Sequence, residues 1–198
     1  MDGKISLKRR MRVLVACEWS NTVRDAFLRI GHDAYSCDLL KAEHPNKNYK
    51  RHIRGNVIPL LREPWDLVIA HPPCRYLCNS GVRWITEEGR LDKMKDAAIF
   101  FLECFLANSP RVCVENPIMH KYAKDVVVVK PTQMIQPYQF GHPESKATYL
   151  WLIGLPLLKP TKIVDGRLNT IHRLGSRGSK ERSRTFNGIA QAMADQWG

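Results

Sequence analysis

Short apolar runs rich in branched residues recur through the first 117 positions of the chain. Each run has the length of a buried strand and is bounded by polar residues, glycine or proline. We expect strands at 11–17, 32–39, 51–57, 65–70 and 111–114, the third of them short. The run WDLVIA at 65–70 is apolar from Leu67 onward, which is typical of a strand buried on both faces.

Three segments between these runs have helical spacing, at 20–31, 58–64 and 87–107. The first carries an apolar face made by Val23, Ala26, Phe27 and Ile30. The third carries one made by Leu91, Met94, Ala98, Phe101 and Phe105. Alternating strands and helices predict a doubly wound α/β fold, with a mostly parallel sheet covered on both faces.

Beyond Pro117 the pattern is looser. MIQPYQF at 134–140 and ATYLWLIG at 147–154 predict two further strands, joined by the loop GHPESK. From 155 to 184 the chain is rich in Pro, Gly, Ser and basic residues without a core period, which predicts a basic loop that is mobile in part. Apolar residues four positions apart then predict a C-terminal helix within 185–198, docked on one face of the sheet.

The chain has 198 residues and 44% hydrophobic content, enough for one well-formed core and too little for two ordinary domains. We therefore expect a single domain spanning 1–198, with a basic extension at 1–10. The first apolar run stops at Glu18, too early for a signal peptide or a membrane span. The six cysteines include no CxxC pair, so we expect no metal site. Scattered reduced thiols are typical of a cytoplasmic protein, and we expect no membrane as partner.

Basic residues exceed acidic ones by 12, because 31 Lys and Arg face 19 Asp and Glu. A polyanion is therefore the leading class of partner, although charge alone does not separate nucleic acid from an acidic membrane surface. The segment 155–184 contributes eight basic side chains, which suit phosphates better than base edges. These are Lys159, Lys162, Arg167, Arg173, Arg177, Lys180, Arg182 and Arg184.

Ligands of open parallel sheets bind beyond the carboxyl ends of the strands, so the residues that follow each predicted strand are site candidates. They are Glu18 and Trp19, Asp38, Asn56, Pro73 and Cys74, and Glu115 and Asn116. A thiol at one strand end and a carboxylate at another is a nucleophile with an acid in reach. Taken singly, Cys74 and Cys78 are equally typical of small buried residues, and His71 is typical of a turn.

PPC after the strand at 65–70 and ENP after the next strand resemble signatures of the cytosine-5 DNA methyltransferases. The closer resemblance is to the short members of this family found in phages and prophages, and it runs from about Met11 to the C-terminus. It rests on ACEWSNTVRDAF, CDLL, AHPPCRYLCNSGVRW, VENPIMH, QPYQFGHPESKATYLWL and RSRTFNGIAQAMA. It implies the Rossmann-like fold of S-adenosylmethionine-dependent methyltransferases, without a sizeable target-recognition domain.

The resemblance makes Cys74 the nucleophile that attacks carbon 6 of a cytosine in DNA, and Glu115 the acid at ring nitrogen 3. Addition of the thiolate turns carbon 5 into an enamine carbon, which accepts a methyl group from S-adenosylmethionine. Pro73 would fix the backbone ahead of the thiol, and Asn116 would orient the loop. Lys146 would contact the base or its phosphate. Because the target atoms are buried in a duplex, the base must be extruded or single-stranded.

For the cofactor, the resemblance implies that Asp38 binds the ribose hydroxyls and that Asn56 faces the adenine amine. The implied cofactor site also includes Cys17, Glu18, Trp19 and Pro72. Larger members of the family carry a glycine-rich turn where this chain has CEWSN. Trp19 in that turn would either stack on adenine or crowd the cofactor out.

Two alternatives stay open: a catalytically inactive DNA-binding or decoy protein on the same fold, and a related pyrimidine-modifying enzyme. The glycine-poor CEWSN turn and the excess of positive charge favour the first. An amino-methylating enzyme is disfavoured, because HPPC lacks the acidic residue and the aromatic neighbour of that class. The short basic segment 155–184 predicts loose sequence specificity, or specificity supplied by a protein partner.

Overall fold

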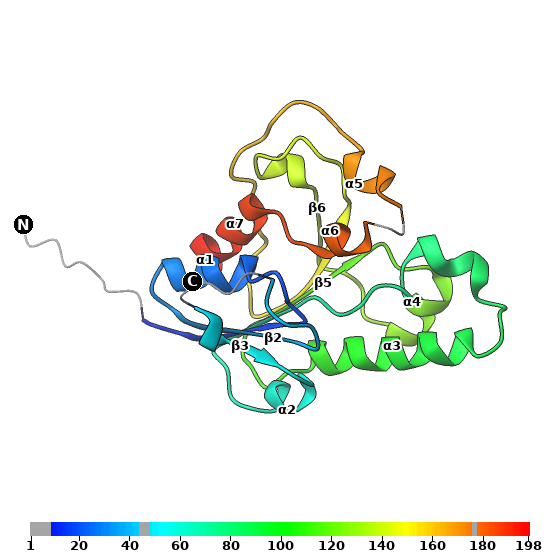
Figure 1. Cartoon of the computed structure of the whole chain (residues 1–198), viewed down its shortest axis with the longest axis horizontal. Coiled ribbons are helices and arrows are strands. Elements are labelled where there is room, and N and C mark those ends of the chain that lie inside the picture. Colours follow the sequence, from blue (N-terminus) through cyan, green and yellow to red (C-terminus); the bar gives the residue numbers. More distant parts are fainter. Residues whose placement is uncertain (1–8, 44–47, 176–177) are drawn as a thin grey trace, which may run out of the picture.

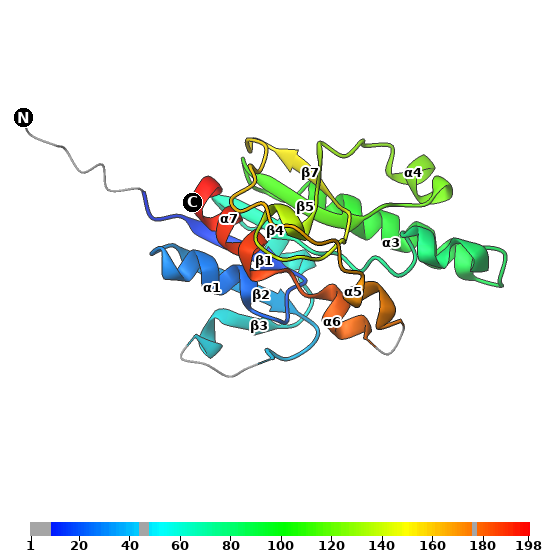
Figure 2. The same cartoon turned by 90° about the horizontal axis from the view of Figure 1, so that it is seen from above.

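The computed structural model describes residues 9–43, 48–175 and 178–198. Its centre is a seven-stranded sheet in the order β3-β2-β1-β4-β5-β7-β6 (Figure 2). The strands are β1 (Arg12–Ala16), β2 (Asp33–Asp38), β3 (His52–Arg54), β4 (Leu67–Ala70), β5 (Val112–Pro117), β6 (Gln133–Ile135) and β7 (Thr148–Ile153). β7 runs antiparallel to β5 and β6, whereas the remaining neighbours are parallel. The predicted doubly wound, mostly parallel α/β sheet is confirmed.

β1 and β4 form the buried centre of the sheet. All four residues of β4 are buried, and so are the last four of β1. Their apolar side chains face both helical layers, which is why the sequence shows unbroken apolar runs here instead of alternation.

Helices cover both faces of the sheet (Figure 1). On one face lie α1 (Thr22–Arg29) and α7 (Asn187–Trp197), whose apolar residues share a core with Val13, Leu67 and Ile69. On the other lie α2 (Ile58–Leu61), α3 (Arg90–Phe105) and α4 (Lys121–Val127). Across the described ranges, no helix is both long enough and apolar enough to cross a membrane.

Most of the predicted elements are confirmed, with shifted ends. α3 is shorter at both ends than the predicted 87–107, and Leu91 on its predicted apolar face is exposed. The sequence does not predict α4, because the β-branched residues of KYAKDVV have weak helix propensity. His120 supplies its N-terminal cap by accepting a hydrogen bond from Ala123 N at 3.1 Å.

The prediction of a strand over 134–140 is wrong in its second half. β6 ends at Ile135, and Pro137 then begins the 3₁₀ turn η3 (Pro137–Gln139). Proline lacks the N–H that a continuing ladder would need.

The predicted basic loop over 155–184 is interrupted by two short helices. This segment contains α5 (Thr170–Arg173) and α6 (Ser179–Ser183). Part of it, residues 159–175, packs against residues 136–147, and we call these two stretches together the upper lobe (Figure 1). Arg177, and residues 1–8 of the predicted basic extension, lie outside the described residues.

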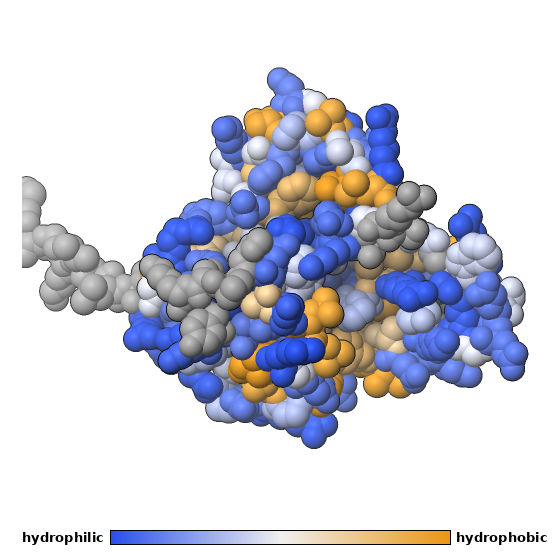
Figure 3. Space-filling model, in the orientation of Figure 1, coloured by the Kyte–Doolittle hydropathy of each residue, from blue (hydrophilic) through white to orange (hydrophobic). Residues whose placement is uncertain are grey.

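Backbone contacts hold the upper lobe together. Gly141 N donates to Lys162 O at 2.7 Å, and Ser145 N donates to Leu168 O at 2.9 Å. Such pairing needs no periodic apolar residues, so the sequence pattern does not reveal it. Hydrophobic side chains such as Ile163 gather on the outside of the lobe instead, above the hydrophilic middle of this face (Figure 3).

Gly188, at the start of α7, makes close contacts with the upper lobe. A Cβ at this position would lie 1.9 Å from Phe140 O, so no larger residue fits without movement. Gly188 N donates to His142 Nε2 at 2.9 Å. The lobe is thereby held beside the carboxyl ends of the central strands.

Candidate active site

The register of the parallel strands brings His71 beside Glu115, the predicted acid. Ala70, the last residue of β4, lies opposite both Ala16 of β1 and Val114 of β5. The next residues along β4 and β5 are His71 and Glu115, which therefore emerge together at the carboxyl edge of the sheet. This is the edge at which open parallel sheets bind their ligands.

His71 and Glu115 form a buried ion pair. His71 Nδ1 lies 3.0 Å from Glu115 Oε2, and the two side chains are 11% and 13% exposed. The separation suits a hydrogen bond, but the N–H direction is not aligned with Oε2, which still has a lone pair to offer. His71 is thus part of the site, and its prediction as a turn residue misses this contact.

Burial opposes charge on both members of the pair, but their mutual attraction prevails. Burial raises the pKa of Glu115, whereas His71, Lys146 and a hydrogen bond from Thr185 lower it, with a net lowering. Burial lowers the pKa of His71, whereas Glu115 and Glu18 raise it, with a net increase. The structure therefore favours an imidazolium beside a carboxylate.

The loop that carries Cys74 is tied to the segment after β5. Asn116 Nδ2 donates to Pro72 O at 3.3 Å, and His120 Nε2 lies 2.9 Å from Tyr76 O. Pro73, in contrast, is exposed at the surface of this loop. Asn116 thus contacts the segment that the sequence expects it to orient.

Cys74 and Cys78 lie on one turn and share a hydrogen bond. Cys78 N donates to Cys74 O at 3.0 Å, and Cys78 Sγ lies 3.0 Å from Ser80 Oγ. The thiol–thiol hydrogen bond lowers the pKa of Cys78 to about 5, and the same bond, with burial, raises the pKa of Cys74. The pair therefore loses one proton readily and holds the second. Ser80 favours the negative charge on Cys78, and Lys146 favours it on Cys74.

Lys146 reaches this site from the segment ahead of β7. Its positive charge opposes the increase in the pKa of Cys74 and of His71 and contributes to the lowered pKa of Glu115, so Lys146 is close enough to act on all three electrostatically. Its backbone N donates to Gln136 Oε1 at 2.9 Å.

Three buried polar atoms at this edge have no hydrogen-bond partner among the residues described. They are His71 Nε2, Glu115 Oε2 and Asn116 Oδ1. Buried polar atoms are normally paired, so a cluster of unpaired ones is typical of a site that receives a ligand. A cavity of about 260 Å³ lies on the lobe side and is lined by Thr185, the residue that hydrogen-bonds Glu115.

The turn after β1 differs from the catalytic edge. Cys17 and Asn21 adopt positive φ angles of 59° and 65°, which glycine adopts more readily. Cys17 hydrogen-bonds Cys104, and this contact together with burial raises its pKa. Glu18 caps α1 by accepting hydrogen bonds from Val23 N at 2.6 Å and Arg24 N at 3.2 Å. The two amides at the start of α1 are therefore already occupied.

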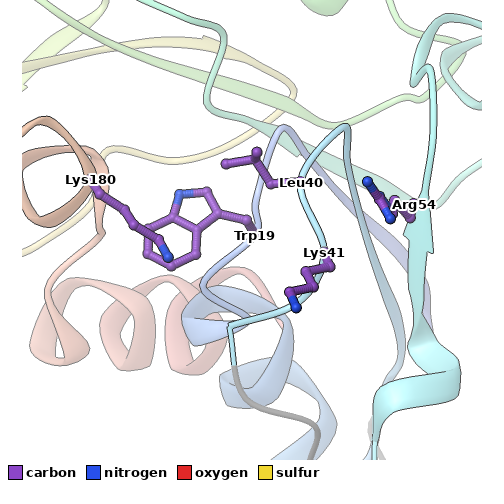
Figure 4. Close-up of a pocket in the computed structure, with 5 residues that line it drawn as sticks. All are labelled: Trp19, Leu40, Lys41, Arg54 and Lys180. Atoms are coloured by element: carbon purple, nitrogen blue, oxygen red, sulfur yellow. The ribbon is translucent and has the colours of Figure 1, made fainter.

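Trp19 lines a pocket of about 390 Å³ with Leu40, Lys41, Arg54 and Lys180 (Figure 4). Its indole Nε1 donates to Ser183 Oγ at 3.4 Å. Lys180 Nζ lies 4.3 Å from the centre of the ring. α6 therefore lies against Trp19, so part of the predicted phosphate-binding segment forms a wall of the predicted cofactor site.

Asp38 and Asn56 lie near this pocket, at the ends of β2 and β3. Asp38 Oδ1 accepts a hydrogen bond from Leu40 N at 2.8 Å, and Asn56 Oδ1 accepts one from Ile58 N at 3.0 Å. Asp38 Oδ2 and Asn56 Nδ2 make no hydrogen bond to any described residue, so both can still bind a ligand.

No protein-family model matches the chain, and no curated protein matches it. Solved structures do. A protein encoded within an E. coli prophage, described as a DNA modification methyltransferase, matches with a TM-score of 0.50 and 14% identity over 83% of this chain. The methyltransferase EhMeth of Entamoeba histolytica matches with a TM-score of 0.50 and 15% identity over 86% of this chain. The chain has the methyltransferase fold.

The methyltransferase fold agrees with the predicted Rossmann-like architecture. The chain spans 54% and 66% of the lengths of these two structures. A structural match at such low sequence identity shows a shared fold. Activity and substrate have to be argued from the site itself.

Proposed function

We propose that the chain is an S-adenosylmethionine-dependent methyltransferase acting on carbon 5 of cytosine in DNA, with Cys74 as nucleophile. The observation that supports this proposal is a set of contacts at one edge of the sheet: Asn116 bonds the loop that carries Cys74, Glu115 pairs with His71, and the charge of Lys146 acts on both Cys74 and Glu115. A thiol, a carboxyl group and a cation in one place match what cytosine needs to become reactive at carbon 5.

The residues divide the chemistry between them. The Cys74 thiolate adds to carbon 6 of the base, and Lys146 stabilises the thiolate because its charge favours the anion. Glu115 donates a proton at ring nitrogen 3, so the electrons displaced by the addition are accommodated in an enamine. Asn116 holds the loop through Pro72 O. Loss of the carbon 5 proton then expels Cys74.

The residues at the ends of β2 and β3 fit the nucleoside part of S-adenosylmethionine, which supplies the methyl group when bound. Asp38 Oδ2 can accept hydrogen bonds from ribose hydroxyls, and Asn56 Nδ2 can donate one to a ring nitrogen. Trp19 and Leu40 give the adjacent pocket its apolar lining. Cys17, Glu18 and Pro72 are engaged with the protein itself and act as supports of this site.

Nucleoside mass spectrometry tests the proposal after incubation of the protein with DNA and S-adenosylmethionine. We expect 5-methylcytosine with the wild type and none with Cys74→Ala. Cys113→Ala is the matched control, because Cys113 is a fully buried thiol in the middle of β5 and its removal leaves the site intact. Equal product from the wild type and Cys74→Ala would overturn the assignment.

A second candidate function is a DNA-binding protein that has lost catalysis. The turn after β1 favours it, because Glu18 occupies the amides of α1 and Lys180 covers the indole of Trp19. A decoy has no need of the cofactor. Calorimetric titration with S-adenosylmethionine separates the two functions, since saturable binding supports the enzyme and its absence, with DNA binding intact, supports the decoy.

A further inference from the structure

His71 is the one member of the catalytic cluster that the proposed chemistry has not yet used. It follows β4 directly, and its backbone N donates to Ala16 O at 3.0 Å. Its side chain is 11% exposed, with Nδ1 beside Glu115 and Nε2 buried without a hydrogen-bond partner in the described chain. Ala16 O thus fixes the backbone of His71 beside β1, and Glu115 of β5 is the partner of its ring.

An ion pair at such depth is not explained by stability. Removing two charges from water is costly, and a buried pair is often no more stable than apolar side chains of similar size. His120, which is more deeply buried at 2% exposure, shows how the fold uses a structural histidine: both of its ring nitrogens are within hydrogen-bonding distance of the backbone, near Ala123 N and Tyr76 O. His71 instead directs one nitrogen to a carboxylate and leaves the other unpaired.

Charged groups from every neighbouring strand end face the imidazole. Glu115 from β5 and Glu18 from the turn after β1 favour its protonated form, and Lys146 from the segment ahead of β7 opposes it. The two carboxylates prevail over Lys146 and over burial, so the pKa of His71 is raised. The same contact keeps Glu115 ionised, since its pKa is lowered.

This charge state poses a chemical problem for the proposed reaction. Ring nitrogen 3 of cytosine carries a lone pair, and an ionised Glu115 offers it a second lone pair instead of a proton. A carboxylate without a proton would repel the base that it is meant to activate. A proton must therefore be available next to Glu115 when the base arrives.

We propose that His71 is a positioning residue that stores the proton which Glu115 delivers to ring nitrogen 3 of cytosine. This inference rests on the proposed function. His71 Nδ1 releases its proton to Glu115 Oε2, and Glu115 passes a proton to nitrogen 3 as the sulfur–carbon 6 bond forms. The thiolate supplies the electrons of the sulfur–carbon 6 bond, the π electrons of the carbon 5–carbon 6 bond form the carbon 4–carbon 5 double bond of the enamine, and the π electrons of the carbon 4–nitrogen 3 bond take up the proton. When Cys74 leaves as thiolate, the carbon 5 proton passes to solvent water, the double bonds shift back, and nitrogen 3 returns its proton to the pair.

The first test needs neither substrate nor cofactor. Protein labelled with ¹⁵N at the histidine side chains is titrated by NMR, and the shifts of His71 report its protonation. We expect His71 in the wild type to remain protonated above the ordinary histidine pKa of about 6.5. In Glu115→Gln its midpoint should fall by at least about one pH unit, because the main group that favours the imidazolium is gone. A wild-type midpoint at or below the ordinary value overturns the inference.

The second test measures the pH dependence of covalent capture. DNA that contains 5-fluorocytosine, with S-adenosylmethionine, traps Cys74 because fluorine does not leave as a proton does. In the wild type, the single-turnover rate of adduct formation should fall as pH rises through the raised pKa of His71, since the stored proton is lost. In His71→Asn the rate near pH 7.5 should fall roughly a hundredfold. The descending limb should also move to lower pH, where Glu115 can hold a proton by itself.

His120→Asn is the matched control for this profile. It removes a second buried histidine that supports the same loop, so any loss of adduct formation caused by altered packing should appear in both variants. In His120→Asn, the descending limb of the pH profile should not shift. An unmoved limb in His71→Asn overturns the role of His71 while the proposed function stands. No adduct with the wild type overturns the proposed function, and the role of His71 with it.

Discussion

The two halves of the carboxyl edge differ in how far their polar groups are satisfied by the protein. Beyond β4 and β5, His71 Nε2 and Asn116 Oδ1 are buried without a hydrogen-bond partner in the described chain, and Glu115 Oε2 lies 3.0 Å from His71 Nδ1 in an ion pair. Beyond β1, Glu18 is bonded to the amides that begin α1, and Trp19 is bonded to Ser183. Buried polar atoms beyond β4 and β5 are therefore available to a ligand, whereas the polar groups of the turn after β1 are already hydrogen-bonded within the protein. We call the first region the catalytic half, after its proposed role, and the second the cofactor half.

This difference separates what each half must do to work. Under the proposed function, the unpaired buried groups beyond β4 and β5 would gain hydrogen bonds from the base, so we expect this half to be organised in advance for its substrate. The cofactor half has to exchange contacts that already exist, in particular that of Lys180 with the indole of Trp19. We therefore expect substitutions in the catalytic half to affect turnover strongly and those in the cofactor half to affect affinity moderately.

The largest expected effect is the loss of Cys74. Cys74→Ala should lower methylation by more than roughly 10³-fold, because the thiol proposed to form the bond to carbon 6 is gone. Affinity for S-adenosylmethionine should stay within a few fold, since the thiol acts on the base alone. Mass spectrometry of the 5-fluorocytosine adduct and calorimetry with the cofactor measure the two quantities separately.

Cys78→Ala sharpens this prediction, because Cys78 hydrogen-bonds Cys74 and has its pKa lowered to about 5. Without Cys78 the adduct should still form on Cys74. Removal of Cys78 should lower the pKa of Cys74, because the contact with Cys78 is the main cause that raises it, so the acid limb of adduct formation should move to lower pH. An adduct lost in Cys78→Ala and retained in Cys74→Ala would transfer the nucleophile to position 78.

Much of the catalytic half can be predicted from sequence, because a strand end followed by PPC or ENP fixes where the side chain emerges. The pairing of His71 with Glu115 cannot, since it depends on β4 and β5 being neighbours in the sheet and in register. The same holds for Thr185, which comes to Glu115 from the far end of the chain. Once β4 and β5 are known to be neighbours in the sheet, the motif HPPC indicates that His71 lies beside Glu115.

The basic segment is harder to interpret from its composition. Its residues lack apolar spacing because backbone pairing with 136–147 and contacts to Trp19 hold them in place. The cation–π contact of Lys180 and the ion pair of Arg184 with Glu43 join parts of the chain more than a hundred residues apart. Local sequence carries no sign of such contacts.

Asp38→Ala should have the next largest effect and should weaken S-adenosylmethionine binding by about 1.5–3 kcal/mol, the range for a charge-assisted hydrogen bond. Turnover at saturating cofactor should change little. Asp92→Ala on the outer surface of α3 is the control for the loss of one negative charge. Equal affinities of the two variants, measured by calorimetry, would remove Asp38 from the cofactor site.

Salt dependence tests whether the basic segment 155–184 binds the phosphates of nucleic acid. Arg167 Cζ lies 3.5 Å from the centre of the Tyr138 ring, and Arg184 forms an ion pair with Glu43. Both arginines are therefore engaged within the protein. Lys159, Lys162 and Arg173 are exposed and form no ion pair with any described residue. Neutralising these three should reduce the slope of log affinity against log salt by roughly 0.9 for each phosphate that the protein no longer neutralises.

The matched variant for this series neutralises Arg167 and Arg184 instead. It should disturb the upper lobe or α6 and leave most of the slope of log affinity against log salt unchanged, because these two side chains are engaged within the protein and do not contact phosphates. Fluorescence anisotropy with a labelled duplex at 50–200 mM salt gives both slopes. If the engaged pair carries the slope, the upper lobe rearranges when DNA binds.

The smallest expected effect concerns Lys180, and it bears directly on the difference between the two halves. Adenine can stack on Trp19 after Lys180 leaves the face of the ring, so Lys180→Met should strengthen S-adenosylmethionine binding by about 0.5–1 kcal/mol, the value of one exposed cation–π contact. Lys41→Met is the control, because Lys41 lines the same pocket and has the same charge but makes no contact with the indole within the described structure. A gain shared equally by both variants would reflect charge alone, since the cofactor is itself cationic. A gain confined to Lys180→Met, and reversed in the double variant with Trp19→Ala, would show that the indole is the surface on which lysine and adenine compete.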